Sequence, residues 1–140
     1  MSTSDTNRKK SAKTSLVYLI ISLVCVLFGA VYEYFSHEVY SYYMLYAFMI
    51  PLVGGTLVFL CIFLSHLPVP KKASFNLYNS GIAALCVGSI FNGVLEIYGT
   101  TNSLISVYWL AGLIFVFLGI IVYLFEIRGS IASCAQEKQG

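Results

Sequence analysis

The chain has 140 residues, of which 59% are hydrophobic and only 10% are charged, and its formal net charge is +2. An average water-soluble domain carries about 25% charged residues. This composition therefore excludes a soluble domain and predicts one domain whose solvent is lipid. No segment combines basic and aromatic residues in the way that nucleic-acid binding requires, so a nucleic-acid partner is not expected.

Four apolar runs follow one another along the chain, and each is long enough to cross a hydrocarbon core about 30 Å thick at about 1.5 Å per residue. Backbone groups in lipid must pair internally, so these runs are predicted to be helices. The expected fold class is an all-α integral membrane protein with a four-transmembrane-helix bundle at 15–126, built from two tandem antiparallel helical hairpins. The expected spans are 15–35, 39–64, 75–98 and 104–125.

Segments 1–14 and 127–140 are polar and are expected to be tails, the first of them basic and disordered. The basic residues of segment 1–14 either bind anionic lipid, at about 1 kcal/mol each, or act only as a topology signal. Every basic residue flanks the same side of the predicted bundle, so the positive-inside rule places both termini in the cytoplasm and the protein in the cell membrane. These residues are Arg8, Lys9, Lys10, Lys13, Lys71, Lys72, Arg128 and Lys138.

In the first span, Cys25, Gly29 and Glu33 step by four residues and so share one helix face. Small residues on a face allow another helix to approach closely. A carboxylate in a membrane helix is costly unless it has a partner, so we expect Glu33 to point toward protein.

The second span begins after a very short turn that contains His37 and Glu38, the nearest approach to a divalent-metal site in the sequence. No metal site or other cofactor is expected. Further along, Pro51 lacks a backbone donor and should bend the helix. Gly54 and Gly55 follow one turn later, as a hinge or as a close-packing site.

In the third span, Gly88, Asn92 and Glu96 also step by four residues, and Gly99 is placed to end the helix. Asn92 should seek a hydrogen bond across a helix interface. Segment 28–35 aligns with 91–98 and pairs Glu33 with Glu96. The alignment predicts an internal repeat of two parallel hairpins, unless the similarity is due to chance.

The two glutamates are the main candidates for function. At helix C-termini a negative charge is disfavoured, so they are expected to share a proton, flank a cation or be solvated at the interface. Tyrosines gather at the same end, and aromatic faces beside carboxylates suit an organic cation, although an aromatic belt explains part of the cluster. The candidate ligand-binding residues are Glu33, Glu96, Asn92, Tyr32, Tyr40, Tyr43, Tyr98, Tyr108 and Trp109.

No Ser-His-Asp, HExxH, Walker or GxGxxG pattern is present, so an enzyme is not expected. The favoured hypothesis is a small non-catalytic binding or accessory subunit with an outward-facing aromatic and acidic pocket. The alternatives are a small oligomeric transporter or channel for a cation or proton-coupled solute that uses Glu33 and Glu96, and a membrane redox or quinone-handling component. The expected partners are the lipid bilayer, further copies or a larger membrane complex, and a small cationic ligand.

Overall fold

The computed structural model describes residues 3–36, 41–65 and 67–137, and all their regular secondary structure is helical. Four stretches are long and apolar enough to cross a membrane: Arg8–Phe35, Tyr42–Leu64, Lys72–Ile97 and Ile105–Ser133. The all-α class and four candidate spans are thus confirmed. The elements are α1 (Thr3–Phe35), α2 (Tyr42–Leu45), the π-helix η1 (Ile50–Leu57), α3 (Val58–Leu64), α4 (Lys72–Ile97) and α5 (Ile105–Glu137).

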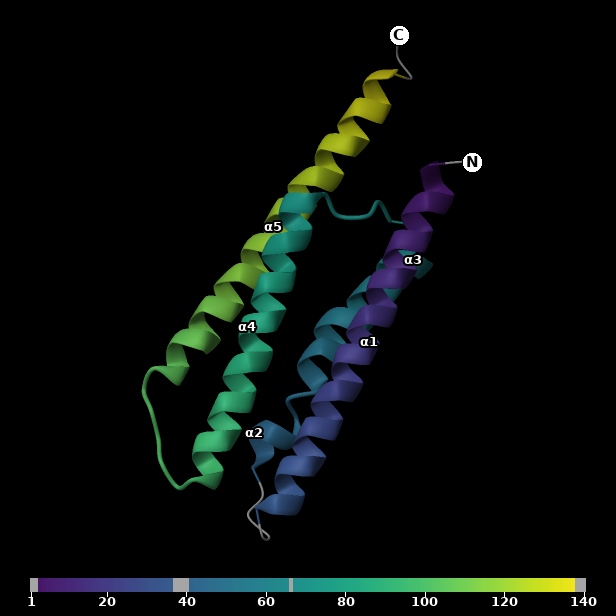
Figure 1. Cartoon of the computed structure of the whole chain (residues 1–140). Helices are drawn as coiled ribbons and strands as arrows, with labels where there is room; N and C mark the ends of the chain where they lie inside the picture. The colour runs from purple at the N-terminus through teal and green to yellow at the C-terminus, as the bar shows by residue number, and fades with distance from the viewer. Residues whose placement is uncertain (1–2, 37–40, 66, 138–140) are drawn as a thin grey trace.

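The helices form two side-by-side groups (Figure 1). In one group α1 packs along η1 and α3, and in the other α4 packs along α5. Helix α2 and η1 connect the groups by contacting α4. We call the end that holds the start of α1, the start of α4 and the end of α5 the terminal end. The opposite end, with α2 and the α4–α5 connection, is the turn end (Figure 1).

The expectation of a disordered N-terminal tail is wrong for residues 3–14, which form the first turns of α1. The segment is ordered because it docks on α3. Ser11 is buried and its hydroxyl donates to the Phe59 carbonyl at 3.0 Å. The Arg8 guanidinium lies 5.0 Å from the centre of the Phe63 ring, a favourable cation–π contact. At the other end of the chain, α5 likewise continues past residue 125 to Glu137.

The second span is not one continuous helix, and its interruption starts further upstream than Pro51. The short helix α2 is followed by turns at 46–48 and then by the π-helix η1. A proline and a π-helix both leave carbonyls outside the regular α-helical pattern, and in lipid such groups need other partners. Hydroxyls from the neighbouring helices add donors along this span: Ser22 donates to Phe48 O, Ser15 to Thr56 O, Ser11 to Phe59 O and Tyr78 to Gly54 O. The Phe48 carbonyl accepts the Leu52 backbone N–H as well.

A wall of aromatic rings fills the place where α1, α3 and α4 meet. Phe59 is 2% exposed, and its ring centre lies 5.7 Å from that of Tyr18 and 5.6 Å from that of Phe75. Tyr78 contacts the same ring edge-on at 6.2 Å. We call Tyr18, Phe59, Phe75 and Tyr78 the aromatic wall. Gly55 makes room for it, since a Cβ there would lie 2.1 Å from the Tyr18 ring.

Helices α4 and α5 approach each other backbone to backbone. A Cβ on Gly81 would lie 2.6 Å from the Val116 backbone nitrogen, and one on Gly119 would lie 2.8 Å from the Tyr78 backbone nitrogen. The Ser74 hydroxyl donates to the Gly119 carbonyl at 2.9 Å. Only 11% of the most apolar stretch of α5 is buried, and α4 is the helix that it contacts. The other faces of α5 therefore point outward.

Candidate functional site

The two predicted acidic residues lie at the turn end in different surroundings. Glu33 is half-buried in the last turn of α1, and its Oε1 is enclosed without a hydrogen-bond partner among the described residues. Glu96 is an exposed residue of α4, and its Oε2 accepts a hydrogen bond from the Ser41 hydroxyl at 2.5 Å. Ser41 directly precedes α2, so Glu96 ties α4 to the second span.

Helix α2 is wedged between the turn ends of α1 and α4. Its residue Met44 is 2% exposed, and a Cβ on Gly29 of α1 would lie 3.5 Å from the Met44 carbonyl oxygen. From the other side, a Cβ on Gly93 of α4 would lie 2.7 Å from the Met44 Cβ. Of the stripe of small residues predicted on α1, Gly29 therefore faces α2, whereas the Cys25 sulfur lies 3.6 Å from that of Cys86 on α4. Beyond α2, the side chain of Tyr32 on α1 interacts with that of Tyr98, the residue that follows α4.

The remaining members of the predicted site are spread over several surfaces. Tyr108 stacks on Phe91 with ring centres 6.1 Å apart, in the contact between α4 and α5. Tyr43 is 45% exposed, while Asn92 and Trp109 are half-buried. The structure thus brings Tyr32 near Tyr98 and places Tyr108 at a different contact. His37, Glu38 and Tyr40 lie outside the described residues.

The face predicted from Gly88, Asn92 and Glu96 is divided between two neighbours. A Cβ on Gly88 would lie 2.8 Å from the Tyr108 Cβ, so Gly88 faces α5. Glu96, in contrast, is bonded to Ser41 ahead of α2. The reason is geometric: a step of four residues overshoots a full helical turn by about 40°, so two steps rotate the side chain by about 80°.

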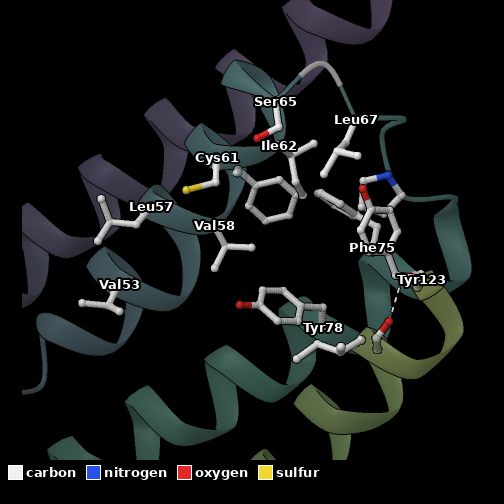
Figure 2. A pocket seen from close by; sticks show the side chains of 15 residues that line it. Val53, Leu57, Val58, Cys61, Ile62, Ser65, Leu67, Phe75, Tyr78 and Tyr123 are labelled. Atoms are coloured by element: carbon white, nitrogen blue, oxygen red, sulfur yellow. Dashed lines mark hydrogen bonds between the residues drawn. The ribbon is translucent and has the colours of Figure 1, made fainter. Parts of the chain in front are cut away.

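Sequence reasoning missed a side-opening cavity in the terminal half of the molecule (Figure 2). The cavity has a volume of about 450 Å³, with the side chains of η1 and α3 on one side and those of α4 and α5 on the other. We call it the lateral cavity. Its apolar lining includes Val53, Leu57, Val58, Ile62, Phe75 and Ile120.

Three of the four hydroxyl groups on the wall of the lateral cavity are engaged within the protein, and the fourth belongs to the exposed Ser65. Those of Ser74, Tyr78 and Tyr123 donate to the carbonyls of Gly119, Gly54 and Pro68 respectively, at 2.9, 2.5 and 2.8 Å. A bound molecule would therefore be held by shape and apolar contact. The one signal in the sequence is the four-residue spacing of Ser74 and Tyr78, which places both on one face of α4.

Within the described part of the chain, no group of three or more His, Cys, Asp and Glu residues is arranged to hold a metal ion. No protein-family model, curated protein or solved structure matches the chain.

Proposed function

We propose that this chain is a non-catalytic integral membrane protein that binds an apolar, chain-like membrane ligand in the lateral cavity. The observation that carries the proposal is a hollow of about 450 Å³ between η1, α3, α4 and α5, within the range of small-molecule sites, which is about 300–1,000 Å³. Because three of its four wall hydroxyls are bonded within the protein and the rest of its lining is mostly apolar, the cavity favours a hydrocarbon over a polar solute.

A flexible chain suits the lateral cavity better than a partner helix does. Membrane helices associate closely through small residues, and a helix with its side chains is about 10–12 Å across. The lining is mostly bulky, and its glycine, Gly119, already lies against the Tyr78 backbone. A narrow chain can enter between the two helix groups without moving them.

The proposal includes an orientation in the cell membrane with both termini cytoplasmic. Its support is the charge distribution: the lysines and arginines belong to the terminal segments and to the α3–α4 connection. The lateral cavity then opens toward the inner leaflet. Association into an oligomer or a larger complex is part of the same proposal, since α5 contacts only α4 among the described helices.

Photolabelling tests the ligand site. The protein is reconstituted in phosphatidylcholine vesicles with a trace of diazirine-bearing hexadecanol, and adducts are mapped by peptide mass spectrometry. We expect adducts on residues that line only this cavity, such as Ile62 and Ile120, to exceed those on outward-facing Leu118 several-fold. Val58→Trp should fill the cavity and remove this excess.

The matched control is Leu60→Trp. Leu60 lies on the same helix and is 39% exposed against 37% for Val58, but it does not line the cavity. Its adduct pattern should equal that of the unmodified protein. Uniform labelling of all outward-facing positions, or equal losses in the two tryptophan variants, would contradict the proposal.

A second candidate function, proton or cation transport, is favoured by one observation. The enclosed Oε1 of Glu33 has no hydrogen-bond partner among the described residues, and a proton or a cation would satisfy it. In proteoliposomes, a proton or cation flux that uses this group should be lost in Glu33→Gln and largely kept in Glu96→Gln. A flux that both variants retain would remove the glutamates from the transport path.

A further inference from the structure

Four lysines surround a second hollow, which lies at the terminal end of the molecule. This basic cavity has a volume of about 520 Å³ and is bounded by the first part of α1, the α3–α4 connection and the first turn of α4. Helix α1 contributes Lys10 and Lys13, while Lys71 and Lys72 stand at the start of α4. The sequence places these pairs almost sixty residues apart, and only the fold brings them to one cavity.

An apolar cavity of about 590 Å³ continues from the basic cavity along the seam between α1 and α4. The two cavities share Lys13, Thr14 and Phe75 as lining residues, so they meet at the level of the first turn of α4. Away from this junction the α1–α4 cavity is walled by apolar residues, among them Val17 and Ala83. A charged compartment thus opens directly into an apolar one.

The other polar groups near these two cavities neither neutralise the lysines of the basic cavity nor add an unpaired polar group to the α1–α4 cavity. In the α1–α4 cavity the Tyr18 hydroxyl donates to the Asn79 side-chain oxygen, so each satisfies the other. Beside the basic cavity, the Glu126 carboxylate accepts the Lys71 backbone N–H at 3.0 Å and does not line the cavity. Four lysines therefore line this hollow, and no carboxylate is among its lining residues.

We infer that the basic cavity and the α1–α4 cavity together bind an anionic phospholipid. The phosphate group lies among Lys10, Lys13, Lys71 and Lys72, and an acyl chain runs down the α1–α4 cavity past Ala83. Basic pockets at the membrane surface, between helices, are typical sites for anionic headgroups. The chemistry also selects the occupant: a free anion would leave the apolar cavity unused, and the cationic headgroup of a zwitterionic lipid would be repelled.

This site is separate from the proposed ligand site. The lateral cavity lies between η1 and α3 on one side and α4 and α5 on the other, whereas the phospholipid site lies between α1 and α4. Phe75 of the aromatic wall borders both. Either site can fail its test while the other stands.

The headgroup is tested with two lipids that have identical chains. The protein in maltoside detergent is titrated with dioleoyl phosphatidylglycerol or dioleoyl phosphatidylcholine, and bound lipid is counted by native mass spectrometry. We expect saturable binding of phosphatidylglycerol and much weaker binding of phosphatidylcholine. The double variant Lys13→Gln, Lys72→Gln should weaken phosphatidylglycerol binding about 30-fold, from the usual contribution of a lysine near an anionic headgroup.

The charge-matched control is Lys9→Gln, Arg128→Gln. Both residues are exposed and neither lines the basic cavity. The control should keep most of the affinity. An equal loss in the two double variants would show diffuse attraction instead of a site and would overturn the inference, as would equal binding of the two lipids.

The acyl chain is tested by filling the α1–α4 cavity with Ala83→Phe. This variant should lose affinity for dioleoyl phosphatidylglycerol, while Ala30→Phe, at an exposed position of α1 outside the cavity, should not. Inorganic phosphate is the competing probe. If millimolar phosphate displaces the lipid completely, or if Ala83→Phe binds the lipid normally, the site recognises a free anion and the phospholipid assignment is wrong.

Discussion

At the scale of single residues, whether a glycine can be replaced by a larger residue depends on which atom lies opposite the position of its missing Cβ. A Cβ on Gly119 would lie 2.8 and 2.9 Å from backbone atoms of Tyr78, which cannot rotate away as the end of a side chain can. Gly129, ten residues later on the same helix, has nothing within 4 Å of the corresponding position. The sequence alone does not distinguish these two glycines.

Gly119→Ala should therefore destabilise the contact between α4 and α5 by about 1–3 kcal/mol, the usual cost of overpacking a tight contact. The measurement is unfolding in mixed micelles with increasing sodium dodecyl sulfate, followed by circular dichroism. Gly129→Ala serves as the control and should leave stability unchanged or raise it slightly, because alanine favours a helix. Equal effects of the two changes would argue against the close approach.

At the scale of elements, the second span is held in its irregular conformation by its neighbours. Three serines of α1 and one tyrosine of α4 donate to carbonyls between Phe48 and Phe59. At Phe48 the hydroxyl is a second donor, because this carbonyl also accepts the Leu52 backbone N–H at 3.1 Å. Additional donors of this kind stabilise carbonyls that lie in an apolar environment. The conformation of η1 is thus a property of the helix group and not of η1 alone.

Ser22→Ala removes the donor to the Phe48 carbonyl, a bond of 3.1 Å made by a residue that is 4% exposed. We expect a loss of stability of about 0.6–1.7 kcal/mol, the range measured for hydrogen bonds between membrane helices. Hydrogen exchange should also become faster in the segment around Ile50. The exposed Ser106 provides the control, and Ser106→Ala should change neither quantity. If the two variants behave alike, the second span does not need this donor.

At the scale of the whole molecule, α1 and α4 are joined by side chains along much of their length. The Cys25 and Cys86 sulfurs lie 3.6 Å apart near the middle of the two helices. The hydrogen bond between Tyr18 and Asn79 lies toward the terminal end, and the interaction of Tyr32 with Tyr98 lies toward the turn end. These contacts hold the two helix groups in one register.

A short, membrane-permeant, thiol-reactive bifunctional cross-linker should therefore link Cys25 to Cys86 within one chain, because their sulfurs lie 3.6 Å apart. An oxidant alone should not link them, since the Cα atoms of α1 and α4 stay more than 8 Å apart and a disulfide needs a Cα separation below about 7 Å. The product is detected by mass spectrometry of linked peptides in a background where Cys61 and Cys134 are replaced by serine. Cys86→Ser should abolish it. A link that forms only between two chains would contradict the side-chain contact between Cys25 and Cys86.

Several features of the fold follow from local sequence and were predicted correctly. The apolar runs set the number and approximate position of the candidate spans, because length and hydrophobicity alone decide whether a helix can cross lipid. Gly99 ends α4 with φ of 69°, a backbone conformation that glycine adopts at no steric cost. The ordered start of α1 was missed because its order comes from Phe59 and Phe63, far along the chain.

The candidate sites divide in the same way. Glu33 and Glu96 stand out in the sequence because a carboxylate in an apolar helix is rare. Their neighbours could not be assigned from the four-residue spacing, since each step of four residues turns the side chain about 40° past a full helical turn. The lateral cavity and the basic cavity carry no motif. Each cavity forms where residues of distant segments leave space unfilled, as between Lys13 and Lys72. The spacing of side chains within one helix cannot predict such a space.

By itself, the sequence determined that this is a helical protein with four segments suited to a membrane, because those properties depend on the length and apolarity of each segment taken alone. Only the tertiary structure decided that the second span is broken, that α2 separates the turn ends of α1 and α4, and that three cavities open between the helix groups. The physical reason is that these features arise from contacts between segments, where the shapes of both partners decide what is filled and what stays open.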